Sequence, residues 1–405
     1  MRDIDLFQAA LGLTLPWRVQ AVEFDEGKGR LDLYIDFAPG ASFPCPVCGR
    51  EGCKAYDTTQ KEWRHLNFFQ HEAYLHAPVP RVRCCEHGVK QVEVPWARPG
   101  SGFTLLFEAF VLALVKQMPV AAVGRLVGEH DTRLWRVLHH YVEEAREEMD
   151  VSEVKRIGVD ETSAKRGHNY ITSFVDLDRA RVLFATEGRD ASTFGRFRLD
   201  LLAHGGRAEQ IEEVCMDMSQ AFLNGARTQL PLAEVVFDKF HVMKLVNDAV
   251  DEVRRAEQKD RPELKRSRYV WLKNPENLTK KQRALLDELT PKSLGLKTSR
   301  AYQMRLSLQE FWTLPPVFAE EFFKRWYFWA THSRLDPMIR VAKTLKKHWT
   351  GLLNWFHSHI SNGILEGINS LIQATKAKAR GYRTTRSLIT ILYLIAGKLN
   401  LESPI

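Results

Sequence analysis

The 405-residue sequence predicts a multidomain α+β protein, and three observations support this class. Two short clusters of cysteine and histidine flank a strand-like stretch within the first hundred residues. Short strands and helices alternate between about residues 156 and 240. A long segment of helical pattern, about 250–355, separates this alternation from a final amphipathic helix. We therefore expect five successive parts, at residues 1–100, 101–150, 151–250, 251–355 and 356–405.

Composition narrows the class of protein. Apolar residues make up 44% of the chain and aromatic residues 10%, which is ample for packed cores. No segment approaches eighteen uninterrupted apolar residues, and the opening stretch "MRDIDLFQAALGL" carries acids, so we expect neither a membrane span nor a secretory signal. Six cysteines in a chain of this length do not form a disulfide framework. The expected location is the reducing bacterial cytoplasm, in association with the nucleoid.

The positive charge is confined to the last third of the chain. Residues 1–260 hold 33 Lys and Arg against 40 Asp and Glu, whereas residues 261–405 hold 25 against 10. Such an asymmetry indicates a polyanionic partner, most simply DNA. The alternative is a solvated helical surface without a partner. Nothing in the sequence indicates a small-molecule substrate.

The cysteine clusters have the spacing of a zinc site. "CPVCG" places Cys45 and Cys48 on a turn, and "RCCEHG" supplies Cys84 and His87 with the same two-residue spacing. Two such knuckles joined by β-strands form a zinc ribbon, in which four ligands surround one structural Zn²⁺. We expect Cys85 to point away from the metal. A redox pair or ordinary buried thiols are the alternatives.

Residues 103–145 have the pattern of a helix-turn-helix. A first helix ends near Pro119, a second spans about 119–127 and stops at Gly128, and a third begins with Asp131 or Thr132 as N-cap. The motif reads DNA with its last helix, although any small three-helix bundle has the same pattern. The side chains expected to face the groove are Arg133, Arg136 and His140.

The central region changes to strands. We expect strands at about 156–163, 169–176 and 180–187, a helix near 190–203, a fourth strand ending in "VCMD", a helix at 219–227 and a fifth strand in "AEVVFD". The order β-β-β-α-β-α-β is that of a ribonuclease H-like fold, in which the first and fourth strands are neighbours. This arrangement brings Asp160 and Asp217 together. Two carboxylates in a partly buried site repel each other unless they share a cation, and magnesium prefers such oxygen ligands.

A third acid is expected from the final helix. In "SNGILEGINSLIQATKAKARGYR", Glu366 lies on a polar stripe with Asn362 and Asn369 and has no cation three or four residues away. We interpret the metal as its missing counter-ion, with Lys376 and Arg380 continuing the same helix face along a phosphate backbone. An ordinary exposed glutamate is the alternative. Asp238 is the rival third acid, although it is better suited to capping the next helix, with His241 as an accessory residue.

The chain resembles the DDE transposases of the bacterial ISL3 insertion-sequence family. The resemblance covers nearly the whole sequence and is carried by "CPVCG", "RCCEHG", "MPVAAVGRLVGEHDTRLWRVL", "IGVDETSAKRGHNYIT", "CMDMS", "VVFDKFHV" and the final helix. It implies that Asp160, Asp217 and Glu366 hold two Mg²⁺ (or Mn²⁺) ions for DNA cleavage and strand transfer. It also implies that the zinc ribbon and helix-turn-helix bind the ends of the element.

The aromatic residues of the long helical segment are expected to form its own core. "FWTLPPVFAEEFFKRWYFWA" alone holds nine of them. Stacking of Trp271 or Trp326 on a flipped base is the alternative. For the whole protein we expect a homodimer or larger assembly on element ends and target DNA. Two other functions stay open, namely a ribonuclease H-like nuclease without strand transfer and a non-catalytic DNA-binding regulator.

Overall fold

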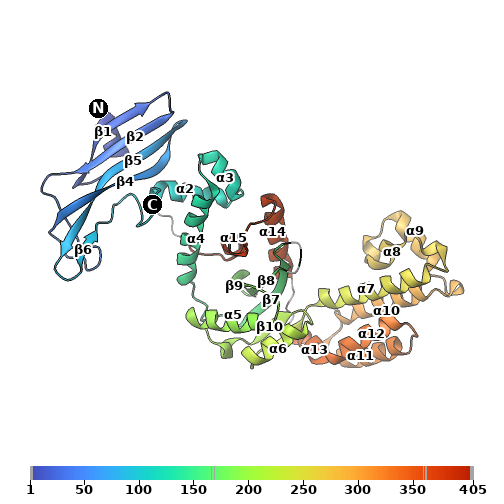
Figure 1. Cartoon of the computed structure of the whole chain (residues 1–405). Helices are drawn as coiled ribbons and strands as arrows, with labels where there is room; N and C mark the ends of the chain where they lie inside the picture. Colours follow the sequence, from blue (N-terminus) through green and yellow to red (C-terminus); the bar gives the residue numbers. More distant parts are fainter. Residues whose placement is uncertain (1–2, 166, 168, 359, 361–362, 402–405) are drawn as a thin grey trace. The chain divides into compact units, whose positions relative to one another are not determined.

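The computed structural model describes residues 3–165, 167, 169–358, 360 and 363–401 (Figure 1). The chain forms two compact units, of which the first runs up to Tyr141 and the second covers Val142–Leu399. None of the described helices is long and apolar enough to cross a membrane. Each unit is built around its own β-sheet.

The sheet of the first unit has the strand order β1-β2-β5-β4-β3, and β6 pairs with β5. Its strands are β1 (Trp17–Asp25), β2 (Arg30–Phe37), β3 (Ser42–Phe43), β4 (Cys53–Phe68), β5 (His71–Cys84) and β6 (Gly88–Gln91), preceded by α1 (Asp3–Ala10). Alternate residues of β5, such as Leu75, Ala77 and Val79, are buried in the core, as the two-residue period of a strand requires. The antiparallel β4–β5 hairpin is the ribbon that the sequence predicts between the cysteine clusters.

Three helices follow in the first unit and lead into the second. They are α2 (Leu105–Val115), α3 (Val120–Val127) and α4 (Asp131–Glu147). Gly128 ends α3 with a φ of 73°, a left-handed conformation that glycine adopts without steric cost. The expected N-cap at Asp131 or Thr132 is wrong, because Asp131 is already helical and the Nδ1 atom of His130 accepts the backbone N–H of Thr132 at 3.3 Å.

The sheet of the second unit has the order β11-β10-β7-β8-β9. The strands are β7 (Arg156–Ser163), β8 (Tyr170–Asp176), β9 (Arg181–Glu187), β10 (Glu213–Met216) and β11 (Glu234–Phe237). β7, β8 and β9 form an antiparallel meander, whereas β10 is parallel to both β7 and β11. The predicted strand ranges are confirmed to within one residue, and so is the neighbourhood of the first and fourth strands.

Helices pack on this sheet. They are α5 (Ser192–Ala203), α6 (Gln220–Gln229), α14 (Gly363–Ala379) and α15 (Thr385–Ala396). Phe194 and Phe197 of α5 stack against Phe174 of β8. The hydroxyl of Tyr393 in α15 accepts the backbone N–H of Ala185 in β9 at 2.9 Å.

A long helical segment separates β11 from α14. Its helices are α7 (Lys239–Glu257), α8 (Arg268–Leu272), α9 (Lys280–Leu289), α10 (Lys297–Phe311), α11 (Pro316–Thr331), α12 (Asp336–Lys347) and α13 (Trp349–Ser358). Short 3₁₀ turns lie at Ala208–Gln210, Pro262–Leu264, Pro275–Asn277 and Lys292–Leu294. Helices α7, α10 and α12 lie side by side (Figure 1). The segment returns to the sheet through α13, where Asn354 Nδ2 donates to the Val235 carbonyl of β11 at 3.0 Å.

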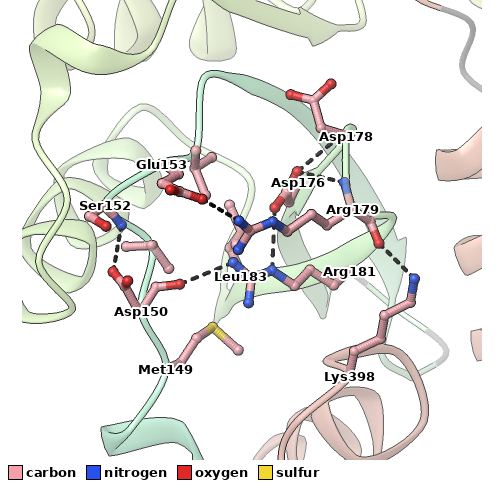
Figure 2. A network of polar contacts seen from close by, with 12 residues as sticks. Met149, Asp150, Ser152, Glu153, Asp176, Asp178, Arg179, Arg181, Leu183 and Lys398 are labelled. Carbon is pink, nitrogen blue, oxygen red and sulfur yellow. Dashed lines mark hydrogen bonds and ion pairs between the residues drawn. The ribbon is translucent and has the colours of Figure 1, made fainter.

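A polar network fixes the end of the sheet where β7 begins (Figure 2). Arg181 donates to the Asp150 carbonyl at 3.0 Å and pairs with Asp176 at 3.3 Å. Lys398, which follows α15, donates to the Arg179 carbonyl at 2.6 Å. Because Asp176 pairs with Ile157 in the β7–β8 ladder, this network holds the start of β7 and leaves its carboxyl end, which carries the acids, unencumbered.

Candidate active site and DNA-binding elements

Three aspartates lie at one edge of the second sheet. Asp160 is in β7, Asp217 directly follows β10, and Asp238 directly follows β11. These three strands are parallel, with Cys215 opposite Gly158 and Met216 opposite Phe237. Continuing these registers by two residues and by one residue brings the three aspartates level with one another. The carboxyl ends of the parallel strands therefore form an acidic edge.

Residues of β7 alternate between two environments. Ile157 and Val159 are buried in the hydrophobic core, so Gly158, Asp160 and Thr162 face the opposite side of the sheet. Helix α14 packs on that side. A Cβ atom added to Gly158 would lie 2.8 Å from Leu365 Cδ1, so the glycine is what allows this close approach. The buried side chains of the helix include the predicted apolar residues Leu365, Ile368 and Ile372.

Asn369 of α14 links the helix to Asp160. Its Nδ2 donates to Asp160 Oδ2, and its Oδ1 accepts the hydroxyl of Thr162 at 2.9 Å. Further along, Lys376 Nζ donates to the carbonyl of Ser163 at the end of β7. The helix is therefore anchored along the strand that carries Asp160. The sequence interpretation placed Asn369 on the polar stripe but assigned it no role, and its spacing of three residues from Glu366 is the signal that could have done so.

Glu366 lies one helical turn before Asn369, about 4.5 Å along the helix axis. Its side chain is exposed, and it forms no ion pair with the part of the chain that the structure describes. The carboxylate oxygens of Asp160, Asp217 and Glu366 do not all lie within 4.8 Å of one another, a separation that two other clusters among the described residues do meet. Asn362, which the sequence analysis placed on the same stripe, lies outside the described residues.

The acidic edge has a strongly negative potential. Burial raises the pKa of Asp160, and the nearby charge of Asp217 raises it further. Burial and both aspartates also raise the pKa of Glu161, against the opposing effect of Arg189. Hydrogen bonding to Asp238 raises the pKa of His241, and the charges of Asp160 and Asp217 add to that effect. Partly buried carboxylates that raise one another's pKa are a donor set that fits a divalent cation.

Asp238 caps α7, as the sequence suggests. Its Oδ1 accepts the backbone N–H of Phe240 at 2.9 Å, and its Oδ2 contacts His241 Nδ1 at 2.8 Å. Both oxygens are thus engaged within the helix start. The buried aspartate and the half-buried histidine form a pair at the rim of the acidic edge.

The cysteine clusters converge in the first unit. Cys45, Cys48, Cys84 and His87 offer ligand atoms that all lie within 4.8 Å of one another. The Sγ atoms of Cys48 and Cys84 are 3.8 Å apart, and Cys84 Sγ lies 3.7 Å from His87 Nδ1. A tetrahedral zinc with Zn–S bonds of about 2.3 Å requires S···S edges of about 3.8 Å. The four residues therefore fit a structural zinc ion.

Neighbouring groups prepare this site for a metal. The backbone N–H groups of Glu86 and His87 lower the pKa of Cys84 to about 6, which favours the thiolate that zinc binds. Cys85 is exposed and contacts the guanidinium of Arg50, so it is not part of the cluster. Cys53 donates to the Arg50 carbonyl at 3.6 Å.

Comparisons with known proteins agree along the whole chain. A family profile described as an ISL3-type DDE transposase matches residues 157–392, which is more than half of the sequence. A profile for the helix-turn-helix domain of transposase family ISL3 matches residues 92–142, and one for the zinc-finger of transposase IS204/IS1001/IS1096/IS1165 matches residues 41–87. The chain belongs to the ISL3 family of DDE transposases.

Two curated relatives extend over almost the full length. The transposase for insertion sequence element IS1557 of Mycobacterium tuberculosis is 30% identical, across 97% of this chain and 96% of that protein. The transposase for insertion sequence element IS1001 of Bordetella parapertussis is 31% identical, across 95% of this chain and 96% of that protein. This chain is thus an insertion-sequence transposase that binds DNA.

The recognition helix of the transposase is α4. Leu134, Val137 and Leu138 point inward and are at most 1% exposed, as predicted. Of the residues expected to face DNA, Arg136 is exposed and His140 is half-buried. Arg133 pairs with Glu129 at 2.6 Å and lies over the ring of Phe103, so DNA must compete with these contacts for its guanidinium.

The basic end of α14 differs from the sequence interpretation. The helix of the transposase ends at Ala379, and Arg380 has a left-handed φ of 57°. The backbone N–H of Gly381 closes the helix on the Lys376 carbonyl at 2.9 Å. The expectation that Lys376 and Arg380 share one continuous helix face is therefore wrong. Lys376 binds β7, and Arg380 is exposed beyond the helix.

Most aromatic residues of the helical segment form its core, as predicted. Phe311, Trp312, Phe323 and Trp326 are buried, whereas Phe318, Phe328 and Trp329 are exposed. Trp271 is fully buried and its indole N–H donates to Ser267, while that of Trp326 donates to the Met304 carbonyl. Base stacking by Trp271 or Trp326 is thus excluded in this conformation.

Proposed function

We propose that the transposase cleaves the ends of an insertion sequence and joins them to target DNA at the acidic edge, with Asp160, Asp217 and Glu366 as metal ligands. The strand and helix order β-β-β-α-β-α-β supports a ribonuclease H-like catalytic core for residues 151–250 and 356–405. The segment of about 251–355 would then be a helical insertion domain. The observation that carries the proposal is the docking of α14 on β7 through the Asp160–Asn369 contact.

Each acid has a distinct position in this proposal. Asp160 and Asp217 are fixed by neighbouring parallel strands. Glu366 is carried to the same side of β7 by the helix turn that precedes Asn369, and it has no ion pair among the described residues that would oppose metal binding. Rotation of its exposed side chain toward the edge would complete the ligand set. Asn369 orients the Asp160 carboxylate by holding one of its oxygens.

Two bound Mg²⁺ or Mn²⁺ ions would supply an activated water or 3′-hydroxyl and stabilise the leaving oxygen in an in-line displacement. The chain's own residues contribute the negative charge that attracts the ions and the fixed geometry of two strands. Asp238 holds His241 beside the aspartates, where the imidazolium form would offset part of their charge. No serine or tyrosine nucleophile is required.

We propose that residues 1–100 and 101–150 bind the terminal repeats as a zinc-stabilised ribbon and a helix-turn-helix. The ligand distances support the zinc ion, and the position of α4 supports a reading helix whose exposed side chains include Arg136. Because two ends must be cut and joined together, we expect a homodimer or larger assembly on DNA. Lys376 and Arg380 would contact DNA only after Lys376 leaves its carbonyl partner in β7.

The test is Mg²⁺-dependent cleavage of a duplex that carries the element's own end. Asp160→Asn, Asp217→Asn and Glu366→Gln should each abolish cleavage and keep binding of the end. Glu234→Gln is the matched control, because Glu234 is an exposed acid at the opposite end of β11. Full cleavage by Asp160→Asn would refute the proposed centre.

Asp238→Asn separates the two candidates for the third acid. Asparagine caps a helix about as well as aspartate, so α7 should persist while the charge is lost. We expect Asp238→Asn to retain more cleavage than Glu366→Gln, and the reverse order would assign the third position to Asp238. A pre-cleaved end supplied with target DNA distinguishes a transposase, which joins the two, from a nuclease that only cuts.

A further inference from the structure

A basic cavity of about 680 Å³ lies in the helical segment, beside the start of α7. It is bounded by α7, by α10 and by the chain that follows α8. Its lining includes three lysines and one arginine, and no acidic residue. Lys239, Lys244 and Lys273 supply the lysine charges, while Phe240 and Trp312 supply aromatic surface. The cavity therefore combines positive charge with flat apolar surface.

Unpartnered polar atoms converge in this cavity. In the part of the chain that the structure describes, few buried side-chain nitrogen and oxygen atoms lack a hydrogen-bond partner, and three of them belong to residues that line it. They are Nη1 of Arg305, Oε1 of Gln309 and Nε1 of Trp312. A buried polar group without a partner costs about 1–3 kcal/mol. Their concentration around one cavity indicates a ligand that satisfies them.

Arg305 is held rigidly for such a role. Its side chain is 2% exposed, its Nε donates to Asn247 Oδ1 at 2.7 Å, and its Nη2 donates to Asn274 Oδ1 at 2.8 Å and to the Leu272 carbonyl at 3.1 Å. These contacts fix the plane of the guanidinium and leave Nη1 unused. Trp312, which is 8% exposed, is fixed by edge-to-face packing on Trp355. The donors are thus positioned before any ligand arrives.

We propose that this cavity receives one unpaired nucleotide of the DNA strand bound at the acidic edge. The inference rests on the proposed function. A nucleobase has a flat face for Phe240 and Trp312, and its edge carries both donors and acceptors for Arg305 and Gln309. The lysines neutralise the adjoining phosphates. A simple anion would leave the aromatic surface and the Gln309 carbonyl unsatisfied.

The position of the cavity relative to the acids supports DNA as the source of the nucleotide. Asp238, which caps α7 at the acidic edge, is followed directly by Lys239 and Phe240, which line the cavity. Consecutive Cα atoms are about 3.8 Å apart, so a strand that passes the acids reaches the cavity within one or two residues' distance. The unpaired nucleotide would therefore lie close to the cut.

The experiment measures binding of the full-length transposase to two duplexes without added divalent metal. Both carry the element's own end and one unpaired flanking nucleotide, which is 2-aminopurine in one duplex and abasic in the other. The base-bearing duplex should bind roughly 5-fold or more tightly, the range expected for stacking of one base. Trp312→Phe and Gln309→Met should narrow this difference. Equal affinities of the wild-type protein for the two duplexes would overturn the proposal.

Controls separate this inference from a folding defect and from the catalytic proposal. Gln309→Met removes an unpartnered acceptor at similar side-chain length, so the thermal midpoint of the free protein should not fall. Lys343→Ala removes an exposed charge from the same segment outside the cavity and should weaken both duplexes equally. Unchanged discrimination in Gln309→Met and Trp312→Phe would refute the cavity even if Mg²⁺-dependent cleavage is intact. Competition by free deoxynucleoside monophosphate at the same affinity would refute DNA as the source.

Discussion

The contact between Gly158 and Leu365 predicts that a single methyl group at residue 158 impairs the active site. An alanine Cβ there would lie 2.8 and 2.9 Å from the two Cδ atoms of Leu365 and 2.9 Å from a Cδ of Leu177. Carbon atoms prefer separations of about 3.5–4.0 Å, so each neighbour would have to retreat by roughly 1 Å. Leu365 is 2% exposed and has little free space. The strain must therefore shift α14 away from β7.

The expected cost of Gly158→Ala is about 1–3 kcal/mol, the usual range for overpacking a core. For a unit of this size, that corresponds to a fall in the melting temperature of roughly 2–10 °C. Cleavage should fall further than stability does, because the shift also breaks the contact between Asn369 and Asp160. Thermal unfolding followed by circular dichroism gives the first quantity, and single-turnover cleavage below the melting range gives the second.

A double-mutant cycle tests the cause. Leu365→Val shortens the side chain that Gly158→Ala meets, so the double variant should recover part of both losses. Gly367→Ala is the matched control, because a Cβ at Gly367 of the same helix has no neighbour within 4 Å. Wild-type stability and cleavage in Gly158→Ala would contradict close packing of α14 on β7.

Three further predictions follow from other contacts. Cys84→Ser should lose bound zinc, measured as metal content of the purified protein, whereas Cys85→Ser should keep it. Asn369→Ala should lower cleavage at least about 10-fold without loss of end binding, whereas Ser370→Ala on the exposed side should not. Burial lowers the pKa of His65 from 6.5 to about 4, so only the unfolded chain is protonated at pH 5.5. Folding of the first unit should therefore weaken by roughly 1 kcal/mol between pH 7.5 and pH 5.5, and urea unfolding of His65→Phe should lack this part of the loss.

The sequence predicts the catalytic sheet well because its strands are short and bounded by clear turns. An apolar run that ends in an aspartate indicates both a buried strand and the edge where it stops, and Asp160 and Asp217 follow that rule. The four zinc ligands are likewise predictable, because their paired spacing reflects the local geometry of a metal knuckle. Both features are local in sequence.

Features that depend on contacts between distant segments were missed. The partnership of Asn369 with Asp160 depends on how α14 settles on β7, which helical periodicity does not determine. The end of α14 at Ala379 depends on the left-handed conformation of Arg380, which sequence pattern alone did not predict. Trp271 and Trp326 were candidates for DNA contacts because periodicity does not tell a buried ring from an exposed one.

The contact between Asn369 and Asp160 also has a consequence for the timing of synthesis. The two residues are 209 positions apart, so at about 5–20 residues per second a ribosome makes the second roughly 10–40 s after the first. A nascent chain can fold its sheet and bind zinc during that interval but still lacks the helix that completes the catalytic acids. In the proposed mechanism, DNA near the translating ribosome is thus protected from a half-made enzyme.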